Sequence, residues 1–572
     1  MQVLDSRRLT GPGLLLDGPG AVLEARLEES ERARAVAAWQ NSARRLLQAV
    51  GWNGETLAYR SFAGGVSLAL TAPIDGLYAA TELNERAWAA AAAELKGDKA
   101  PDLGSAIASL LDDIHRERDP IVATLYREAR SRGLTFLHGE DLISVGSGAG
   151  ALMWQVSAKP RLADIQWEAA RDIPIVLVTG SNGKTTVVRL IGAMVEAAGR
   201  IAGISSTDGV TVGETLLEEG DFAGPSGARM VLRHHEVATA ILETARGGIL
   251  RRGLPVERAD VAVITNIADD HLGEFGIESL ADLADTKMVV AKPLGTAGTL
   301  VLNADDPLLV ERSKAVRCRL IWFSLNPSSP VVTGHLDGGG TAVIVESGTL
   351  VLAEASRRTP LASVVEIPIT FGGTAVHNVA NALAAAAGAS ALGIASETIS
   401  STLRRFGRAL DDNPGRANLL ELGGARILLD FAHNPHGMSA LVDVARTLPA
   451  DRRLVLVGQA GDRNDEAIRA LARAAWELQP DHVVVKDMEG YLRGRAPGEV
   501  PTLLASEFSR LGLPEDSISR PGPEISSVRR ALEWARPGDL LVLAVHEDRR
   551  AVIGLLDQLS AADWRAGDPL PA

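Results

Sequence analysis

The segment that most constrains the fold is an apolar run that ends in a glycine-rich turn and continues into a helical pattern. The run Ile173-Pro-Ile-Val-Leu-Val-Thr179 is typical of a buried strand, and residues 186–198 carry apolar side chains at helical spacing. Between them lies Gly180-Ser-Asn-Gly-Lys-Thr-Thr186. A strand, a glycine-rich turn and a helix start in this order form a phosphate-binding loop, because backbone N–H groups and the helix N-terminus face a polyphosphate there. The segment therefore predicts an ATP site on a parallel sheet.

Side chains in this turn supply the cation and the hydroxyl that nucleotide chemistry needs. Lys184 is placed to neutralise β- and γ-phosphate oxygens, and the Thr185 hydroxyl to reach Mg²⁺. The spacing departs from the standard pattern, because position 178 holds Val where a further glycine would stand. Only eight of the 58 basic residues are lysines, so a lysine here is informative, since its amine does chemistry that a guanidinium does not. The predicted ATP-binding residues of the turn are Gly180, Asn182, Gly183, Lys184, Thr185 and Thr186.

At 572 residues the chain is too long for one ordinary core. From residue 173 onward apolar strands alternate with helices, as in βαβ units, and a second series of four strands begins after Pro414-Gly415. Residues 1 to about 160 hold strand-like and helical segments but no motif that indicates a chemical function. We predict a multidomain α/β protein, with an α+β domain over 1–160, a central parallel-sheet domain over 165–412 and a Rossmann-like α/β domain over 413–572. A β-rich insertion is expected near 330–370.

The composition excludes several classes of protein. A net charge of −14 leaves no basic footprint for nucleic acid. No run reaches the roughly 18–20 uncharged apolar residues that cross a bilayer, and the N-terminus lacks the pattern of a secretory signal. A single cysteine, Cys318, excludes an intrachain disulfide framework. We expect a cytoplasmic protein with neither nucleic-acid nor membrane partners.

The glycine-rich turn and several segments after it resemble the Mur ligase superfamily of ATP-dependent amide ligases. Glu243 ends one buried strand, and Thr265-Asn-Ile-Ala-Asp-Asp-His271 follows another. The remaining matches, in chain order, are Asn303 in Leu302-Asn-Ala-Asp-Asp-Pro307, His377-Asn-Val-Ala-Asn381, Pro414-Gly-Arg416 and Asp430-Phe-Ala-His-Asn-Pro435. The resemblance implies the fold of a P-loop Mur ligase core followed by its C-terminal domain.

The resemblance also implies two Mg²⁺ ions. Thr185 and Glu243 would bind one ion, while His271 and a CO₂-carboxylated Lys287 would bind the other. The implied catalytic set is Lys184, Glu243, His271 and Lys287. Three of them have a plainer interpretation when taken alone: Glu243 as a solvated carboxylate, His271 as a surface histidine and Lys287 as a surface cation. Lys292 is the alternative site for the carbamate.

Further roles follow from the same resemblance. Asn303, His377 and Asn381 would line the base side of ATP, and Arg416 and Asp430 would reach ATP from the last domain. The substrate-binding residues would be Arg246, His433, Asn434, Asp462, Arg463, Asp487, Arg493 and Arg495. Arg251 or Arg252 would join Arg246 in recognising the acceptor carboxylates. Solvated charges and structural ion pairs are the alternative interpretation of this substrate set.

Within the superfamily, the chain resembles the Mur-ligase half of cyanophycin synthetase. Examples are Thr207-Asp-Gly-Val-Thr-Val-Gly213, Gly224-Pro-Ser-Gly-Ala228 and Gly461-Asp-Arg-Asn-Asp465. The domain predicted over 1–160 also resembles, more weakly, the N-terminal domain of that enzyme, with Arg8-Leu-Thr-Gly-Pro12 as the best match. Only about 25 residues separate 146–150 from the phosphate-loop strand, so no ATP-grasp module fits there, although cyanophycin synthetase has one. We therefore expect one amide-forming reaction on a smaller acceptor, or else one step performed beside a partner enzyme.

The implied activity is an ATP-dependent ligation that activates a carboxylate as an acyl phosphate and joins it to an amine of an amino acid or related compound. Small-molecule carboxylate and amine substrates are the expected partners, and a homodimer or homotetramer is the expected assembly. Two alternatives stay open: a peptidoglycan- or folate-type ligase, and a non-catalytic nucleotide-binding subunit.

Overall fold

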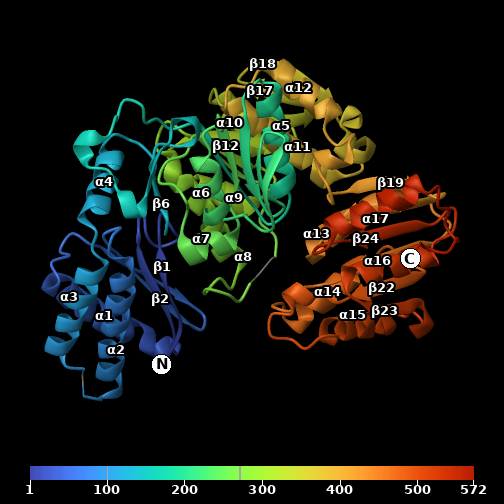
Figure 1. Ribbon diagram of the computed structural model, residues 1–572. Coiled ribbons are helices and arrows are strands. Elements are labelled where there is room, and N and C mark those ends of the chain that lie inside the picture. The colour runs from blue at the N-terminus through green and yellow to red at the C-terminus, as the bar shows by residue number, and fades with distance from the viewer. Residues whose placement is uncertain (100, 270–271, 572) are drawn as a thin grey trace.

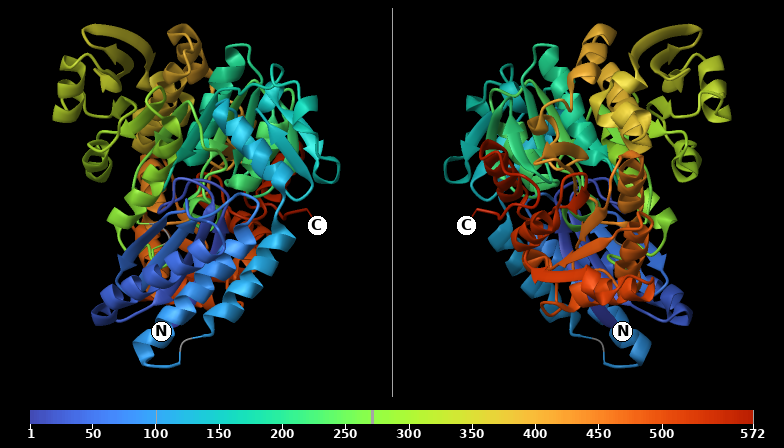
Figure 2. Two further views of the ribbon diagram at one scale, coloured as in Figure 1. Left: turned by 90° about the vertical axis from the view of Figure 1, so that its left-hand side faces the viewer. Right: turned by 90° about the vertical axis from the view of Figure 1, so that its right-hand side faces the viewer.

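The structure is a computed structural model that describes residues 1–99, 101–269 and 272–571. Three sheet-based modules follow one another along the chain (Figure 1). The two terminal modules extend from the same side of the central one (Figure 2). No helix among the described residues is both long and apolar enough to cross a membrane.

The N-terminal module pairs an antiparallel sheet, in the order β1-β2-β4-β3, with two long helices that pack against each other. These elements are β1 (Gln2–Leu9), β2 (Gly20–Arg26), β3 (Leu57–Phe62), β4 (Gly65–Thr71), α1 (Glu29–Ala49) and α2 (Leu77–Lys96). Two shorter helices and a small sheet follow: α3 (Leu103–Glu117), α4 (Pro120–Ser131), β5 (Phe136–His138), β6 (Leu142–Val145) and β7 (Leu152–Gln155). The indole N–H of Trp39 donates to Asn84 Oδ1 (2.8 Å), which satisfies the one polar atom of this buried ring.

The central module is an eleven-stranded sheet in the order β11-β10-β9-β12-β8-β13-β14-β15-β16-β17-β18. The strands are β8 (Ile175–Thr179), β9 (Ala202–Ser206), β10 (Gly209–Val212), β11 (Thr215–Glu219), β12 (Thr239–Glu243), β13 (Val261–Ile264), β14 (Thr299–Asn303), β15 (Arg319–Ser324), β16 (Thr341–Glu346), β17 (Thr349–Glu354) and β18 (Arg357–Ser363). The helices are α5 (Lys184–Ala197), α6 (Pro225–Arg233), α7 (Arg246–Arg252), α8 (Leu280–Met288), α9 (Pro307–Ser313), α10 (Pro330–Asp337), α11 (Val376–Ala391) and α12 (Ser396–Arg405).

Strand β8 runs parallel to both neighbours, β12 and β13, in the middle of this sheet. Its side chains alternate between two cores, with Val176 and Val178 packed toward α5 and α11, and Ile175 and Leu177 toward α6. Because both faces are covered, an unbroken apolar run is what this strand needs. The strands that follow β8 in the chain lie on both sides of it in the sheet, β9 and β12 on one side and β13 on the other. Ligands of open α/β sheets bind at such a point, beyond the carboxyl ends of the strands.

The β-rich segment expected near 330–370 is part of this same sheet. Strand β16 pairs in parallel with β15, and β17 and β18 then continue the sheet edge as antiparallel strands. Helix α10 fills the first part of the segment. Short alternating strands at a sheet edge do not indicate from sequence which sheet they join.

The C-terminal module is a six-stranded sheet in the order β19-β20-β24-β21-β22-β23, parallel except for β19. Its strands are β19 (Asn418–Leu422), β20 (Ala425–Asp430), β21 (Arg453–Val457), β22 (His482–Lys486), β23 (Ile518–Gly522) and β24 (Leu540–Ala544). Its helices are α13 (Pro435–Thr447), α14 (Asp465–Trp476), α15 (Glu499–Arg510), α16 (Glu524–Trp534) and α17 (Arg549–Ala561). Two helical layers cover this sheet, α13–α15 on one face and α16–α17 on the other.

A fully buried ion pair lies inside the C-terminal module. Lys486 Nζ contacts Glu524 and donates to Ala544 O (2.7 Å). Glu524 also accepts hydrogen bonds from the backbone N–H groups of His546, Glu547 and Asp548. The pair therefore fixes the turn between β24 and α17, and with it the start of α17.

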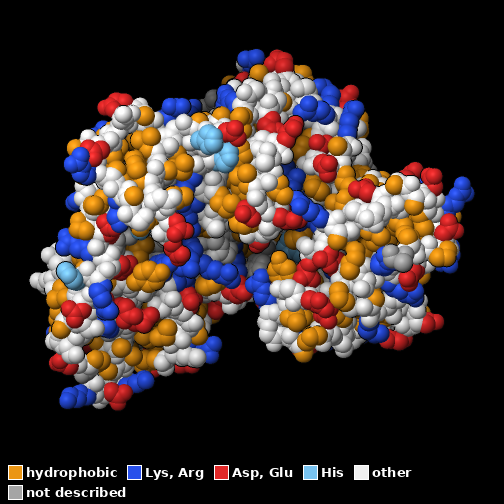
Figure 3. Space-filling model, in the orientation of Figure 1, with side chains coloured by type: hydrophobic (Ala, Val, Ile, Leu, Met, Phe, Trp, Pro, Cys, Tyr) orange, Lys and Arg blue, Asp and Glu red, His pale blue; other side chains and the backbone are white. Residues whose placement is uncertain are grey.

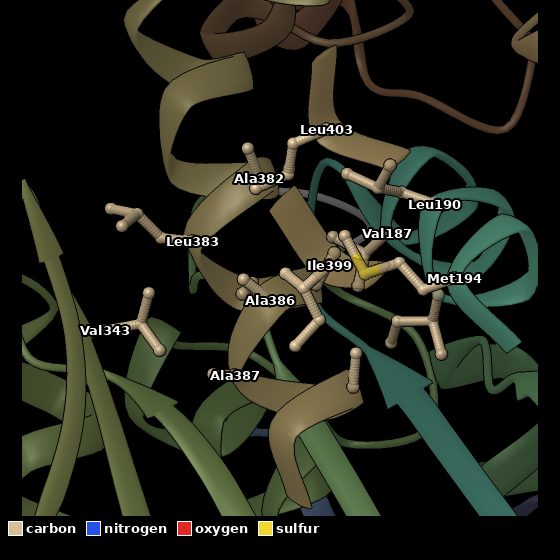
Figure 4. Packing of buried hydrophobic residues seen from close by; sticks show 14 of the residues in the cluster. Val187, Leu190, Met194, Val343, Ala382, Leu383, Ala386, Ala387, Ile399 and Leu403 are labelled. Atoms are coloured by element: carbon tan, nitrogen blue, oxygen red, sulfur yellow. The ribbon is translucent and has the colours of Figure 1, made fainter. Parts of the chain in front are cut away.

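Helix α11 crosses the central core on a surface of small side chains. Figure 4 shows Ala382 and Ala386 beside Val187 and Met194 of α5. Residues 381–389 of α11 are all buried. Alanine at these positions lets the backbones approach closely, which also brings the start of α11 to the glycine-rich loop.

Enlarging this surface should destabilise the protein. We expect Ala386→Leu to lower the free energy of unfolding by about 1–3 kcal/mol, because a well-packed core has no room for the added carbons. Urea denaturation measures the change. Ala89→Leu, at an exposed position in α2, is the control and should have little effect. Equal stability of the two variants would contradict close packing at α11.

Candidate functional site

The glycine-rich loop joins the carboxyl end of β8 to the start of α5. Gly180 has φ +149° and Gly183 has φ +84°, and residues that carry a side chain rarely adopt these backbone angles. A Cβ at Gly180 would overlap Thr265, and one at Gly183 would overlap the Asn381 amide. The loop is therefore pressed against two neighbouring segments, and its shape depends on glycine at both positions.

The cation of the loop lies over its own backbone. Lys184 Nζ donates to Gly180 O (3.1 Å) and to Ser181 O (3.0 Å). Both acceptors are neutral carbonyls, so the positive charge is not cancelled by a carboxylate in contact with it. The arrangement leaves a cation beside the loop backbone, as phosphate binding requires.

Two oxygen donors meet beside this cation. Thr185 Oγ1 donates to Glu243 Oε2 (2.9 Å), and the Thr207 N–H also donates to that oxygen (3.3 Å). Glu243, at the end of β12, is 2% exposed, and its Oε1 is buried without a hydrogen-bond partner among the described residues. Burial raises the pKa of Glu243, and the nearby Lys184 opposes that rise. An unsatisfied buried carboxylate oxygen beside a hydroxyl is a donor set that fits Mg²⁺.

A cavity of about 570 Å³ lies in front of the loop, between the central and C-terminal modules. Besides the loop, its lining comes mainly from β12, β14, α11, the carboxyl end of β20 and α13. The predicted residues that line it are Asn182, Gly183, Lys184, Thr185, Thr186, Glu243, Asn303, His377, Asn381, Arg416, Asp430 and His433. Segments separated by some 250 residues thus meet around one space.

Polar groups on the α11 side of the cavity are held by local hydrogen bonds. Asn303 Nδ2 donates to Thr265 O (3.1 Å), and Asn381 Nδ2 donates to Asn378 Oδ1 (3.0 Å). Burial, together with the nearby His436, lowers the pKa of His377 to about 4. His377 is therefore neutral at physiological pH, which leaves its ring free for hydrogen bonding or stacking with a base.

Two ionisable groups of opposite charge, Arg416 and Asp430, lie on the C-terminal side of the cavity. The Arg416 guanidinium lies 4.2 Å from the centre of the Phe431 ring, and burial lowers its pKa. Asp430 accepts from the Ala417 N–H (2.7 Å). Burial raises the pKa of Asp430 to about 6, against the opposing effect of Arg416.

Asp208 joins the central and C-terminal modules electrostatically. It is paired with Arg189 of α5 (3.1 Å), with Arg416 (3.1 Å) and with Arg549 of α17 (2.5 Å). Burial alone would raise the pKa of Asp208, but the three arginines lower it to about 2. The carboxylate therefore stays ionised and holds two arginines of the C-terminal module against the core.

Asn182 makes a second junction between these modules. Its Oδ1 accepts from Asn434 Nδ2 (2.9 Å), and its Nδ2 lies 3.0 Å from His436 Nδ1. Asn434 also caps α13 by accepting from the Gly437 N–H (2.8 Å). Asn413 Nδ2 donates to Thr186 Oγ1 (3.2 Å) nearby. The phosphate loop is thus in direct contact with the C-terminal module.

Five residues of these junctions were not predicted as site residues: Arg189, Asp208, Asn413, His436 and Arg549. Asp208 stands in the segment Thr207–Gly213 that carries the resemblance, which is the only signal for it in the sequence. His436 directly follows the Asp430–Pro435 match. Apart from the Arg189–Asp208 pair, the residues paired at these junctions lie more than 200 positions apart in the chain, so spacing gives no indication of the contacts.

The predicted substrate residues fall into separate places, and only His433 lines the cavity. Arg246 is paired with Glu274. In the C-terminal module Asp462 lies beside Arg463 (3.4 Å) and Arg493 (3.7 Å). Arg495 is paired with Asp465 and Glu499, and Asp487 accepts from the Gly498 N–H (2.6 Å).

Of the two predicted ligands for a second metal, His271 lies outside the described residues. Lys287, in the last turn of α8, is 3% exposed. The alternative, Lys292, contacts Asp17 (2.7 Å) and donates to Gly13 O (2.8 Å), so its amine serves the boundary with the N-terminal module. These contacts give the Lys292 amine a structural role at that boundary.

Comparison with known proteins finds matches over both later modules. Residues 178–389 match the model of the Mur ligase middle domain, and residues 415–545 that of the Mur ligase glutamate ligase domain. Cyanophycin synthetase of Trichormus variabilis is 36% identical over 385 residues, which cover 67% of this chain and 42% of that protein. The chain thus spans about two fifths of the length of that relative.

Other similar proteins are covered more completely. UDP-N-acetylmuramoylalanine–D-glutamate ligase of Pelotomaculum thermopropionicum is 31% identical over 364 residues, covering 63% of this chain and 71% of that enzyme. Among solved structures, E. coli FolC in complex with ADP is 18% identical, with a TM-score of 0.47, and the match covers 67% of this chain and 89% of that chain.

Removing the charge of Asp208 should loosen the C-terminal module. We expect Asp208→Asn to weaken its docking by on the order of 3 kcal/mol, because two buried arginines lose their counter-ion. Faster tryptic cleavage after Arg416 measures the change. Asp285→Asn, which removes a half-exposed partner of Arg312, is the control. Unchanged cleavage of Asp208→Asn would show that the pairing does not hold the modules together.

The same pairing predicts a dependence on pH. The pKa of Asp208 in the folded protein, about 2, lies below its usual 3.8. Its contribution is therefore fully present above pH 3.8 and is lost as the pH falls toward 2. Asp208→Asn should accordingly abolish this part of the acid-induced loosening, measured by the same cleavage assay with an acid-stable protease.

Proposed function

The chain belongs to the Mur ligase family, and on this premise we propose that it is an ATP-dependent ligase that joins a carboxylate to an amine. The carboxylate is activated as an acyl phosphate, and ADP and inorganic phosphate are the other products. The amine belongs to an amino acid or a related compound. The observation that carries the proposal is the Thr185–Glu243 pair, with its buried unsatisfied oxygen, beside Lys184.

The chemistry answers a specific difficulty. A carboxylate is a poor electrophile, so it does not condense with an amine at neutral pH. In the first step a carboxylate oxygen attacks the γ-phosphorus of ATP, the bond to the β-phosphate bridge breaks, and ADP leaves. In the second, a neutral amine attacks the acyl carbon, the carbon–oxygen bond to phosphate breaks, and the nitrogen gives up a proton. Positioning and charge stabilisation are the main contributions of a protein to such steps.

The residues around the cavity suit these tasks. Lys184 and the loop N–H groups would hold the phosphates, and Asn303, His377 and Asn381 would line the base. Thr185 and Glu243 would hold one Mg²⁺, which offsets phosphate charge when bound. Arg416 and Asp430 would reach the nucleotide from the C-terminal module, and a second Mg²⁺ would involve His271 and Lys287.

We propose that Lys287 carries a carbamate, formed from its neutral amine and CO₂ with loss of a proton. Its burial supports this proposal, since a buried ammonium is costly whereas a carbamate can ligate a metal ion. The amine-side substrate would meet Asp462, Arg463 and Arg493 in the C-terminal module. That one reaction is catalysed, on an acceptor smaller than the polymer made by cyanophycin synthetase, stays a prediction, as do a homo-oligomeric state and a cytoplasmic location.

Lys184→Met should reduce ATP-dependent product formation on the order of a thousandfold, because the phosphates lose their cation. Phosphate release with a panel of acids and amino acids measures it, and Lys314→Met, at an exposed lysine, is the control.

With an ¹⁸O-labelled acid, the label should appear in inorganic phosphate. Label in AMP would contradict acyl-phosphate formation, and ATP binding without turnover of any pair would favour the non-catalytic subunit.

Lys287→Arg keeps the positive charge but forms no carbamate. We expect turnover to fall by on the order of tenfold or more. Protein equilibrated with ¹³C-bicarbonate should show a carbamate signal by NMR, absent from Lys287→Arg and retained in Lys314→Arg. Near-normal turnover of Lys287→Arg would overturn the carbamate.

A further inference from the structure

A second cavity, of about 630 Å³, lies between the N-terminal and central modules. Strand β1 and helix α7 both line it, and the N–H of Thr10, directly after β1, donates to Arg252 O (2.8 Å). Its basic lining residues are Arg7, Arg8, Arg251 and Arg252, and its acidic ones are Asp5 and Asp221. We call this space the arginine cleft. Figure 3 shows Lys and Arg side chains gathered here, on the rim of the hollow that faces the C-terminal module.

Three of these arginines have no carboxylate partner among the described residues. Arg7 is paired with Asp5 and Glu24. The charge of Asp5 is therefore neutralised within this group and does not offset the other arginines of the cleft. Within the described part of the chain, no carboxylate lies within 4.0 Å of Arg8, Arg251 or Arg252. Behind them, burial lowers the pKa of Arg229, and repulsion from Arg252 adds to that effect. The cleft is therefore positive within a protein whose net charge is −14.

Aromatic rings hold two of the guanidinium groups in place. Arg8 lies over the Tyr78 ring, 3.9 Å from its centre, and Arg251 lies 5.6 Å from the centre of the Phe275 ring. Stacking uses the face of a guanidinium and leaves its edge N–H groups available. Those edges form paired hydrogen bonds with carboxylates. The cleft thus offers positioned donors for anions.

The cleft opens beside the proposed reaction site. Helix α7 begins three residues after Glu243, and Gly247 and Gly248 of its first turns line the cleft. A Cβ at Gly247 would meet nothing within 4 Å, so this part of the lining is open space. At 1.5 Å per residue, Arg251 and Arg252 lie roughly 8 Å along the helix from Arg246. That is the length of a few covalent bonds of a substrate.

We propose that the arginine cleft binds the carboxylate substrate through carboxylates other than the one that is activated, so that the substrate is a polycarboxylate. The inference rests on the proposed function and names its substrate class. A short acidic peptide and a small tricarboxylic acid share this chemistry. Either would place one carboxylate toward Glu243 and at least two toward Arg8, Arg251 and Arg252.

Binding is tested on the full-length protein without ATP or Mg²⁺, by isothermal titration calorimetry at low salt. The probes are propane-1,2,3-tricarboxylate, triglutamate and butyrate. We expect at least one polycarboxylate to bind, and butyrate to bind more than tenfold more weakly. The double variant R251Q/R252Q should weaken the polycarboxylate on the order of tenfold or more, because two charged hydrogen-bond donors are lost. The tighter of the two polycarboxylates identifies the source.

The matched control is R357Q/R358Q, which alters an adjacent pair of exposed arginines on β18. It should bind the polycarboxylate as the unaltered protein does. Equal binding by R251Q/R252Q, or no preference for polycarboxylates over butyrate, would overturn the proposal. Because no ATP is present, polycarboxylate binding that survives in a Lys184→Met variant without turnover separates this inference from the proposed ligase reaction.

Discussion

The arrangement of the candidate site depends on one buried carboxylate, Asp208. Its three arginines come from two modules, and without it each would lose its paired carboxylate in a largely buried place, which is costly in free energy. The pairing brings Arg416 to the cavity and fixes α17 against the core. A cavity between modules can have a defined shape only if the modules are held in register, and here electrostatics at low dielectric supplies that restraint.

The two cavities use positive charge differently inside an acidic protein. At the phosphate loop a single lysine lies over backbone carbonyls, and much of the remaining polarity comes from N–H groups and hydroxyls. In the arginine cleft, by contrast, Arg8 and Arg251 are stacked on aromatic rings and have no carboxylate partner in the part of the chain that the structure describes. Charges more than about 8 Å apart are largely screened in physiological salt. The net charge of the whole chain therefore says little about what either local site attracts.

Much of the architecture can be predicted from the sequence because neighbouring residues determine it, through apolar periodicity and the composition of turns. The buried strands Ile175–Thr179 and Val261–Ile264 and the glycine-rich turn between β8 and α5 have periods and composition that leave few alternatives. The positions of Glu243 and Asn303 at strand ends follow as well, since the carboxyl ends of parallel strands share one edge. The resemblance to Mur ligases supplied their suggested roles, which the strand pattern alone does not.

What could not be predicted depends on long-range contacts. The Asp208 pairing joins residues 208 and 549, and the arginine cleft joins residue 8 to residue 252, with nothing in either local sequence to indicate its partner. The membership of β16–β18 in the central sheet depends on edge pairing, which short alternating strands leave undetermined. Arg246 illustrates the same limit, because its pairing with Glu274 arises only when two loops meet.

The buried Lys486–Glu524 pair has a mechanical consequence. By fixing the backbone of residues 546–548, it makes the start of α17 continuous with the interior of the C-terminal sheet rather than part of a pliable surface turn. The C-terminal module should therefore move as a rigid body, and Arg549 is one of the residues that attach it to the central module. A rotation of that module relative to the phosphate loop would have to be absorbed by the connection 406–417 between α12 and β19, where Ala417 has φ +52°.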